Sequence, residues 1–290
     1  MSGPLVIGHR GACGYLPELT AGALRLAAEQ GADGIEIDVV PTTDGRLVVR
    51  HDADLAPTTD AAAVLGPLAR VDEHTWAELV GLSARERYPH LRPASAAHDG
   101  DERLLVLPDV VRLAEELELL LVVEIKDAAE FRAKGLDPAP LVERDLDGAR
   151  CPIVLESFEK TPLDALAHLG HPRYYLIDDE GRAADERRSY AEELEDPAAL
   201  ARFAGVSVST RLVSAERVAA LHAVGLAVWT WTLRPENAFL PQPWRSDAGD
   251  ARFGDWRGFW RSLADAGVDG VFADHPDLAV ALRDTPPPAD

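Results

Sequence analysis

The chain has 290 residues, of which 47% are hydrophobic and 27% are charged, the ordinary balance of a globular protein. We expect one large domain or two small ones at this length. With 29 basic and 50 acidic residues the formal charge is −21, which argues against nucleic acid or an anionic membrane as a partner. A small anionic ligand stays compatible with this charge, because a few cations and a metal ion can reverse the field inside one pocket.

The sequence shows no sign of export or membrane insertion. Its start lacks a basic region followed by an apolar one, and no apolar run approaches the roughly 20 residues of a membrane helix. The two cysteines, Cys13 and Cys151, form neither a disulfide framework nor a zinc spacing. We therefore expect reduced thiols, a cytoplasmic protein and no stable membrane association. The oligomeric state stays open.

Eight short runs rich in Val, Ile and Leu predict buried strands, with helical patterns between most of them. The helices are expected to begin near Thr20, Pro108, Thr161–Pro162, Ser214 and Pro276. Eight strands with helical returns predict a (β/α)8 TIM barrel, an α/β fold, with an open doubly wound sheet as the alternative. The predicted strands are Leu5–His9, Gly34–Val39, Leu120–Ile125, Ile153–Leu155, Arg173–Ile177, Gly205–Val208, Ala227–Trp231 and Asp269–Phe272.

A further apolar run, Arg46–His51, follows the second strand too closely for a parallel crossover. Asp44-Gly45 is typical of a hairpin, so this run is expected to fold back antiparallel, outside the barrel. We predict one barrel domain over residues 1–284, with a polar insertion at about 52–104 and a disordered tail at 285–290. The insertion and an irregular stretch at 234–254 follow strand ends, so we expect both to shape the active-site face.

Two predicted strands carry charges where a barrel strand is normally apolar. Glu36 and Asp38 alternate with isoleucines in the second strand, so both carboxylates share one face. Glu124 and Lys126 do the same in the next strand. Three inward carboxylates repel, at roughly 4 kcal/mol for a pair ~4 Å apart in a dielectric of ~20, so they need a proton or a cation.

Oxygen ligands without neighbouring cysteine or histidine suit Mg²⁺ or Ca²⁺ better than zinc. The sequence therefore predicts one divalent cation held by Glu36, Asp38 and Glu124. The alternative is a purely structural salt bridge from Lys126 to one or two of these acids. One lysine does not balance three carboxylates, which favours the metal site.

Two histidines stand at strand ends on the same expected rim. His9 ends the first strand and is followed by Arg10, while His51 ends the hairpin and is followed by Asp52. Imidazoles titrate near neutral pH, so a pair can supply an acid and a base to one reacting centre. The Arg10 fork suits a phosphate or a carboxylate. Of the remaining histidines, only His275 at the end of the last strand is a further candidate for the site.

Two tryptophans alternate on the seventh predicted strand. Trp229 is expected in the core, whereas for Trp231 core packing and an apolar wall against a ligand are equally open.

Taken together in order, these segments resemble the glycerophosphodiester phosphodiesterase family, in its longer bacterial branch. The resemblance spans nearly the whole chain, although each short motif alone is weak. It rests on 9–11, 17–20, 31–39, 44–52, 124–126, 157–158, 231–232 and 267–276.

The resemblance implies a TIM-barrel hydrolase that releases glycerol 3-phosphate and an alcohol from glycerophosphodiesters, with a place in glycerol and lipid metabolism. Its matching positions make Glu36, Asp38 and Glu124 metal ligands and His9 and His51 the acid–base pair. The other matches are phosphate contacts, Arg10 and Lys126, and an aromatic near the glycerol, Trp231.

Two departures from the family pattern bear on the site. Leu19 replaces a usual Asn or His, and Glu156 replaces a common Gln.

The attacker is either water or the neighbouring glycerol hydroxyl, and the roles of the two histidines are not assigned. The alternatives are a lysophospholipase D or lyase acting on lipids and a non-catalytic phosphodiester-binding protein. The head group and the choice between Mg²⁺ and Ca²⁺ stay open.

Overall fold

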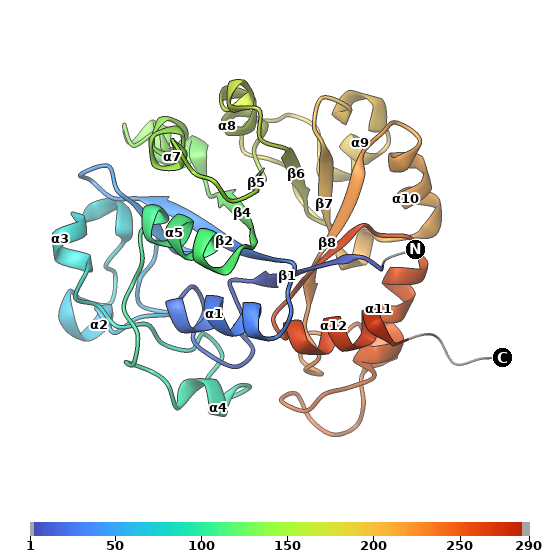
Figure 1. Cartoon of the computed structure of the whole chain (residues 1–290), viewed down its shortest axis with the longest axis horizontal. Helices are drawn as coiled ribbons and strands as arrows, with labels where there is room; N and C mark the ends of the chain where they lie inside the picture. Colours follow the sequence, from blue (N-terminus) through green and yellow to red (C-terminus); the bar gives the residue numbers. More distant parts are fainter. Residues whose placement is uncertain (1–2, 286–290) are drawn as a thin grey trace.

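The computed structural model describes residues 3–285 and has a closed parallel barrel at its centre (Figure 1). The strand order β1-β9-β8-β7-β6-β5-β4-β2-β3, with a further pairing of β1 to β2, closes a ring of eight parallel strands. The predicted (β/α)8 fold is confirmed, and the open sheet is excluded. The strands are β1 (Leu5–His9), β2 (Gly34–Pro41), β3 (Leu47–Val49), β4 (Leu120–Ile125), β5 (Ile153–Ser157), β6 (Arg173–Ile177), β7 (Gly205–Ser209), β8 (Ala227–Leu233) and β9 (Gly270–Ala273).

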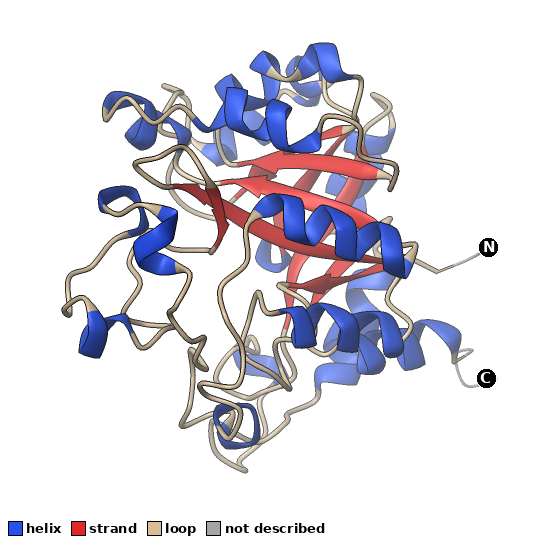
Figure 2. Cartoon of the chain, turned by 60° about the vertical axis from the view of Figure 1, so that its left-hand side comes forward, coloured by secondary structure: helices blue, strands red, loops and turns tan. Residues whose placement is uncertain are grey.

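Helices cover the outside of the strands (Figure 2). They are α1 (Ala21–Glu29), α2 (Ala61–Val64), α3 (Trp76–Leu79), α4 (Pro93–Ala96), α5 (Leu107–Leu117), α6 (Ala128–Ala133), α7 (Pro138–Leu146), α8 (Lys160–Ala165), α9 (Tyr190–Leu194), α10 (Ala215–His222), α11 (Trp256–Asp265) and α12 (Pro276–Asp284). Short 3₁₀ turns are η1 (Val71–Glu73), η2 (Ala167–Leu169), η3 (Pro197–Leu200), η4 (Thr210–Leu212) and η5 (Gln242–Trp244).

The expected helix starts are mostly confirmed. Thr20 caps α1 by accepting from the backbone N–H of Ala23, and Ser214 caps α10 in the same way. The helix start predicted at Thr161–Pro162, with proline as the first residue, is wrong by two residues, because α8 begins at Lys160 and Pro162 is the third residue of its first turn. Proline is tolerated there, since the first turn of a helix lacks intrahelical acceptors for its N–H groups.

Side-chain alternation divides the barrel into layers. One set of strand residues faces the helices and joins the main core, including Ile35, Ile37 and Val123. The opposite set fills the barrel interior with an apolar layer: Ile7, Val122, Val154, Tyr174, Trp229 and Phe272. Each strand rises about 7 Å over two residues, so the next inward positions form a second layer nearer the carboxyl ends. That layer carries the charged residues.

β3 is antiparallel to β2, with Val39 opposite Val49, as the hairpin prediction requires. The insertion that follows it contains α2, α3 and α4; in Figure 1, α2 and α3 lie at the left of the molecule and α4 lies below α1. The insertion, although polar in composition, also contains buried apolar residues. Apolar side chains from it pack with Val40 and Val48 of the hairpin in a second core, including Leu55, Val71, Leu79 and Leu82. This core fixes the insertion to the barrel.

No helix in residues 3–285 is long and apolar enough to cross a membrane. The predicted disordered tail lies, apart from Thr285, outside the described residues. Cys13 is buried, Cys151 is partly buried, and both are free thiols.

Candidate active site

Strand register gathers the predicted acids and His9 at one end of the barrel. His9 pairs with Glu36 across β1 and β2, and Asp38 pairs with Glu124 across β2 and β4. The register of β4 and β5 likewise places Glu156 beside Glu124. Because parallel strands end on one face, these neighbours share the mouth of the barrel.

Glu36, Asp38 and Glu124 form a compact buried cluster, with one carboxylate oxygen from each lying within 4.8 Å of the others. Glu36 Oε1 and both carboxylate oxygens of Asp38 are buried without a hydrogen-bond partner. Burial, together with the charge of Asp38, raises the pKa of Glu36 well above its usual value. Burial also raises the pKa of Glu124 to about 7. Ionised oxygens left without donors are costly, so the cluster suits a divalent cation.

Lys126 reaches the cluster and forms the salt bridge considered as the alternative. Its Nζ donates to Glu124 Oε1 at 2.7 Å and lies 3.7 Å from Asp38 Oδ1. Burial works against the charge of Lys126, but Glu124 and Asp38 raise its pKa, so it stays protonated. The salt bridge is therefore present, yet it leaves Glu36 Oε1 without a donor. One ammonium group therefore does not satisfy the carboxylate oxygens of the cluster.

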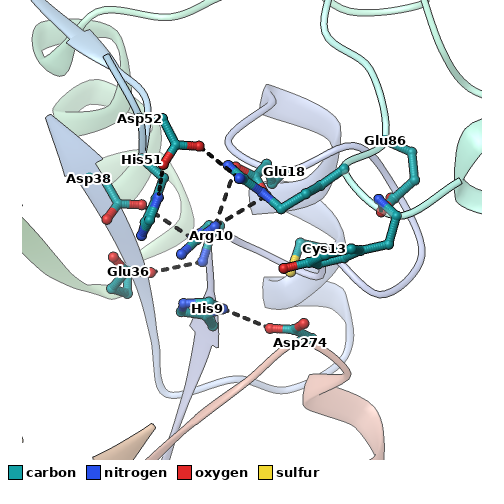
Figure 3. A network of polar contacts seen from close by, with 12 residues as sticks. His9, Arg10, Cys13, Glu18, Glu36, Asp38, His51, Asp52, Glu86 and Asp274 are labelled. Atoms are coloured by element: carbon teal, nitrogen blue, oxygen red, sulfur yellow. Dashed lines mark hydrogen bonds and ion pairs between the residues drawn. The ribbon is translucent and has the colours of Figure 1, made fainter. Parts of the chain in front are cut away.

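Arg10 occupies the space between the cluster and a further acid, Glu18. Its backbone N–H donates to Glu36 Oε2 at 2.9 Å, and its guanidinium lies 3.3 Å from Asp38 Oδ2 and 3.2 Å from Glu18 Oε2 (Figure 3). Burial alone would raise the pKa of Asp38, but its neighbours His51, Arg10 and Lys126 lower it to about 2. The left-handed backbone at Arg10 (φ 55°) turns its side chain back over the strand ends.

His9 is held from inside the protein. Its Nδ1 lies 2.7 Å from Oδ1 of Asp274, which follows β9 and is 1% exposed. The second oxygen of Asp274 accepts from Arg92 at 2.6 Å and Arg234 at 2.9 Å. These arginines outweigh burial and hold the pKa of Asp274 well below its usual range, so the aspartate is ionised and Nδ1 of His9 donates the hydrogen bond. Burial and the charge of Arg10 lower the pKa of His9 to about 4.

His51 has the same arrangement nearer the solvent. Its Nδ1 lies 2.6 Å from Asp52 Oδ1, and its Nε2 lies 3.3 Å from Lys126 Nζ. A protonated lysine only donates, so Nε2 accepts and Nδ1 carries the proton. Burial and Arg10 also lower the pKa of His51. Both imidazoles thus keep their Nδ1 protons and offer an Nε2 lone pair.

These residues border a cavity of about 540 Å³. Seven of the eight predicted site residues line it, and the exception is Asp38. The seven are His9, Arg10, Glu36, His51, Glu124, Lys126 and Trp231. Trp231 meets Phe158 edge to face with ring centroids 5.5 Å apart, and its indole N–H donates to the backbone oxygen of Ser207. Trp231 therefore forms a wall of the cavity, whereas Trp229 packs in the barrel interior as expected.

The two departures from the family pattern have different surroundings. Glu156 lines the cavity, is 1% exposed and accepts from Ser207 Oγ at 2.5 Å. Burial raises the pKa of Glu156 well above its usual value, so it adds less negative charge than its residue type suggests. Leu19 has a left-handed backbone (φ 59°), and its side chain packs in the main core instead of making a polar contact.

Sequence reasoning did not identify the groups that hold the histidines in place. Asp274 directly follows a barrel strand, and this position would have been sufficient to place it at the active-site end of the barrel. Glu18, Arg87 and Arg92 come from loops and an insertion, where no periodicity predicts proximity. His275, the further candidate, is buried beside the rings of Tyr15 and Phe253 and does not line the cavity.

Comparisons with known proteins agree with this geometry. The model of the glycerophosphoryl diester phosphodiesterase family matches residues 9–278. A glycerophosphodiester phosphodiesterase of Bacillus altitudinis is 25% identical over 96% of this chain and 98% of its own length. One from Arabidopsis thaliana is 28% identical, over 94% of this chain and 84% of its own.

Solved structures share the fold. A Silicibacter pomeroyi protein to which the same activity is assigned has a TM-score of 0.78 at 27% identity, covering 97% of this chain and 93% of its own. An Oleispira antarctica phosphodiesterase, solved with the product sn-glycerol-3-phosphate, has a TM-score of 0.74 at 22% identity and covers 98% of both chains. The barrel, its charged mouth and the near full-length family match lead to one conclusion: the chain belongs to the glycerophosphoryl diester phosphodiesterase family and is a phosphoric diester hydrolase.

Proposed function

We propose that the chain hydrolyses water-soluble glycerophosphodiesters to glycerol 3-phosphate and an alcohol, with a divalent cation at the acidic cluster and His9 and His51 as the acid–base pair. The observation that carries this proposal is a cluster of three buried carboxylates, two of which have oxygens without a hydrogen-bond partner, at a cavity that His9 and His51 both line.

The donor set supports a hard cation. Glu36, Asp38 and Glu124 offer only carboxylate oxygens, the ligands of Mg²⁺ and Ca²⁺. When bound, such an ion offsets the negative charge of the phosphodiester and the further negative charge that develops on its oxygens during the reaction. Arg10 and Lys126 line the same cavity and add positive charge next to it. A small anionic ligand is thus compatible with a chain of formal charge −21.

The histidines supply the proton transfers. One imidazole Nε2 takes the proton of the attacking oxygen, which forms a bond to phosphorus. The bond from phosphorus to the leaving alcohol oxygen breaks, and the other histidine, which enters the reaction as an imidazolium with a second proton on Nε2, donates that proton to the alcohol oxygen. Asp274 and Asp52 stabilise the imidazolium form of their partners and keep each ring in the required tautomer. The negative charge of the bound diester raises the pKa of the imidazole that serves as acid.

A coupled assay for glycerol 3-phosphate release tests this function. We expect release from diesters with choline, ethanolamine or glycerol head groups. A lysophospholipid tests the lipid-directed alternative through release of its head-group alcohol, because this cleavage leaves an acylated glycerol phosphate and no free glycerol 3-phosphate. That alternative is favoured if the lipid is the better substrate. Following the phosphorus NMR signal during turnover distinguishes the two attackers, because attack by the glycerol hydroxyl passes through a cyclic phosphate. Binding of every diester without release from any would contradict the proposal.

A further inference from the structure

We propose that Arg87 and Arg92, two arginines of the insertion, are positioning residues that hold the two active-site histidines through their aspartate partners. The roles of the histidines in catalysis rest on the proposed function. The arrangement of the arginines does not depend on that function, because it consists of contacts within the structure, from the insertion to the barrel mouth and to the loops around it.

Arg92 holds the His9 side. It stands just before α4, and its side chain is only 4% exposed. Its Nη2 donates to Asp274 Oδ2 at 2.6 Å, its Nε donates to Glu236 Oε1 at 2.7 Å, and its Nη1 donates to the backbone oxygen of Cys13 at 3.1 Å. One rigid guanidinium therefore joins the insertion to three separate parts of the chain. The other oxygen of Asp274 faces His9.

Arg87 holds the His51 side in the same way. Its Nη1 lies 2.7 Å from Asp52 Oδ2, while Oδ1 of that aspartate contacts His51. Its Nε and Nη2 donate to the two oxygens of Glu18, at 2.8 and 2.6 Å. Glu18 in turn contacts Arg10, which also lines the cavity. Arg87 thus fixes Asp52 and the partner of Arg10 together.

The insertion does not depend on these arginines for its attachment. Its own apolar core, with Leu55, Val71 and Leu79, already packs against Val40 and Val48 of the hairpin. A buried guanidinium paired with carboxylates contributes little net stability compared with apolar packing. The two guanidinium groups instead fix geometry, because the five N–H donors of each lie in one plane and define the orientation of the carboxylates that they contact. Each carboxylate then fixes the ring and the protonated nitrogen of its histidine.

Lysine substitutions separate geometry from charge. R87K and R92K keep the positive charge, but one ammonium group cannot reproduce contacts made by three guanidinium nitrogens. We expect each variant to lower kcat by roughly 10–10²-fold, the scale of a misplaced catalytic group, with a smaller change in KM. R85K is the matched control, because Arg85 lies in the same segment and is exposed. It should retain wild-type kcat.

The leaving group distinguishes a displaced acid from a general loss of structure. A diester with a p-nitrophenyl group releases p-nitrophenolate, which departs without protonation. With this substrate a defect in the acid histidine shrinks, while a defect in the base remains. We expect one of R87K and R92K to recover with it and the other to stay impaired. Equal defects of both variants on both substrates, with lowered melting temperatures, would overturn the proposal, as would kcat values matching R85K.

A readout that needs no turnover keeps this test independent of the proposed function. Nitrogen-15 NMR of labelled histidines reports which ring nitrogen carries the proton. R92K should change the signal of His9 and leave His51 as it is, and R87K should do the reverse. Unchanged tautomers in both variants would overturn the positioning role. If wild-type protein released no glycerol 3-phosphate while these shifts appeared, the proposed function would fail and the positioning would stand.

Discussion

The two histidine–aspartate pairs of the cavity are built alike but lie in different surroundings. The side chains of His9 and Asp274 are 10% and 1% exposed, and two arginines hold the aspartate. Those of His51 and Asp52 are 29% and 33% exposed, and one arginine holds that aspartate. The first pair lies at a barrel strand end, and the second lies beyond the hairpin.

This difference shows how burial and charge act together. Around Asp274 the dielectric is low, so each ion pair is strong but each lost partner is expensive. Around Asp52 water screens the charges, so the pair orients the ring while adding little to stability. We therefore expect the two pairs to be similar in catalysis and different in folding.

Removing either imidazole should have the largest effect on turnover. H9A and H51A should each lower kcat by ~10²–10⁴, the usual contribution of one acid or base, without loss of the folded state. Steady-state rates of glycerol 3-phosphate release, with circular dichroism as the folding control, measure both. Near-normal turnover in either variant would remove that histidine from the pair.

Neutralising the aspartates should separate the two pairs in stability. D274N leaves Arg92 and Arg234 facing a neutral amide in a buried site and should lower the free energy of unfolding by about 3–5 kcal/mol. D52N, at the more exposed pair, should cost about 1 kcal/mol or less. Urea unfolding of both variants provides the comparison. Equal losses would show that burial does not distinguish the pairs.

The loss of unfolding free energy in D274N should depend on pH in the way that the low pKa of Asp274 dictates. A carboxylate whose pKa is lower in the folded state stabilises the protein when the pH is above the ordinary pKa of the group, 3.8. This stabilisation is lost as the pH falls toward the pKa of the folded state. The difference in unfolding free energy between wild type and D274N should therefore persist from about pH 7 to about pH 4 and shrink below that. A difference already absent at about pH 5 would contradict the assignment of an ionised Asp274.

The aromatic wall should matter least. W231F keeps an apolar ring in the cavity but removes the indole N–H that donates to Ser207. A hydrogen bond of this kind contributes about 1 kcal/mol, so kcat/KM should fall roughly fivefold. The same assay as for the histidine variants measures it, and an unchanged kcat/KM would show that the bond does not orient the wall.

Strand alternation and strand ends made much of this molecule predictable. Glu36 and Asp38 had to share a face, because successive side chains of a strand alternate, and the hairpin followed from Asp44-Gly45. The eight-strand barrel followed from the spacing of apolar runs. The cluster with Glu124 required only that neighbouring parallel strands end together.

The insertion was the part that periodicity could not reach. Arg87 and Arg92 lie in irregular backbone, and their partners Asp52 and Asp274 are remote from one another in sequence. Such contacts depend on how an irregular loop closes over the barrel, which local pattern does not encode. The apolar core of the insertion was missed for the same reason, since its members are scattered among polar residues.

The central claim is that Glu36, Asp38 and Glu124 hold a divalent cation that the reaction needs. The most direct measurement is glycerol 3-phosphate release by one wild-type sample before chelation, after removal of divalent ions, and after addition of Mg²⁺ or Ca²⁺. Activity should be lost on chelation and restored by one of these ions. Full activity in the chelated sample would contradict the account.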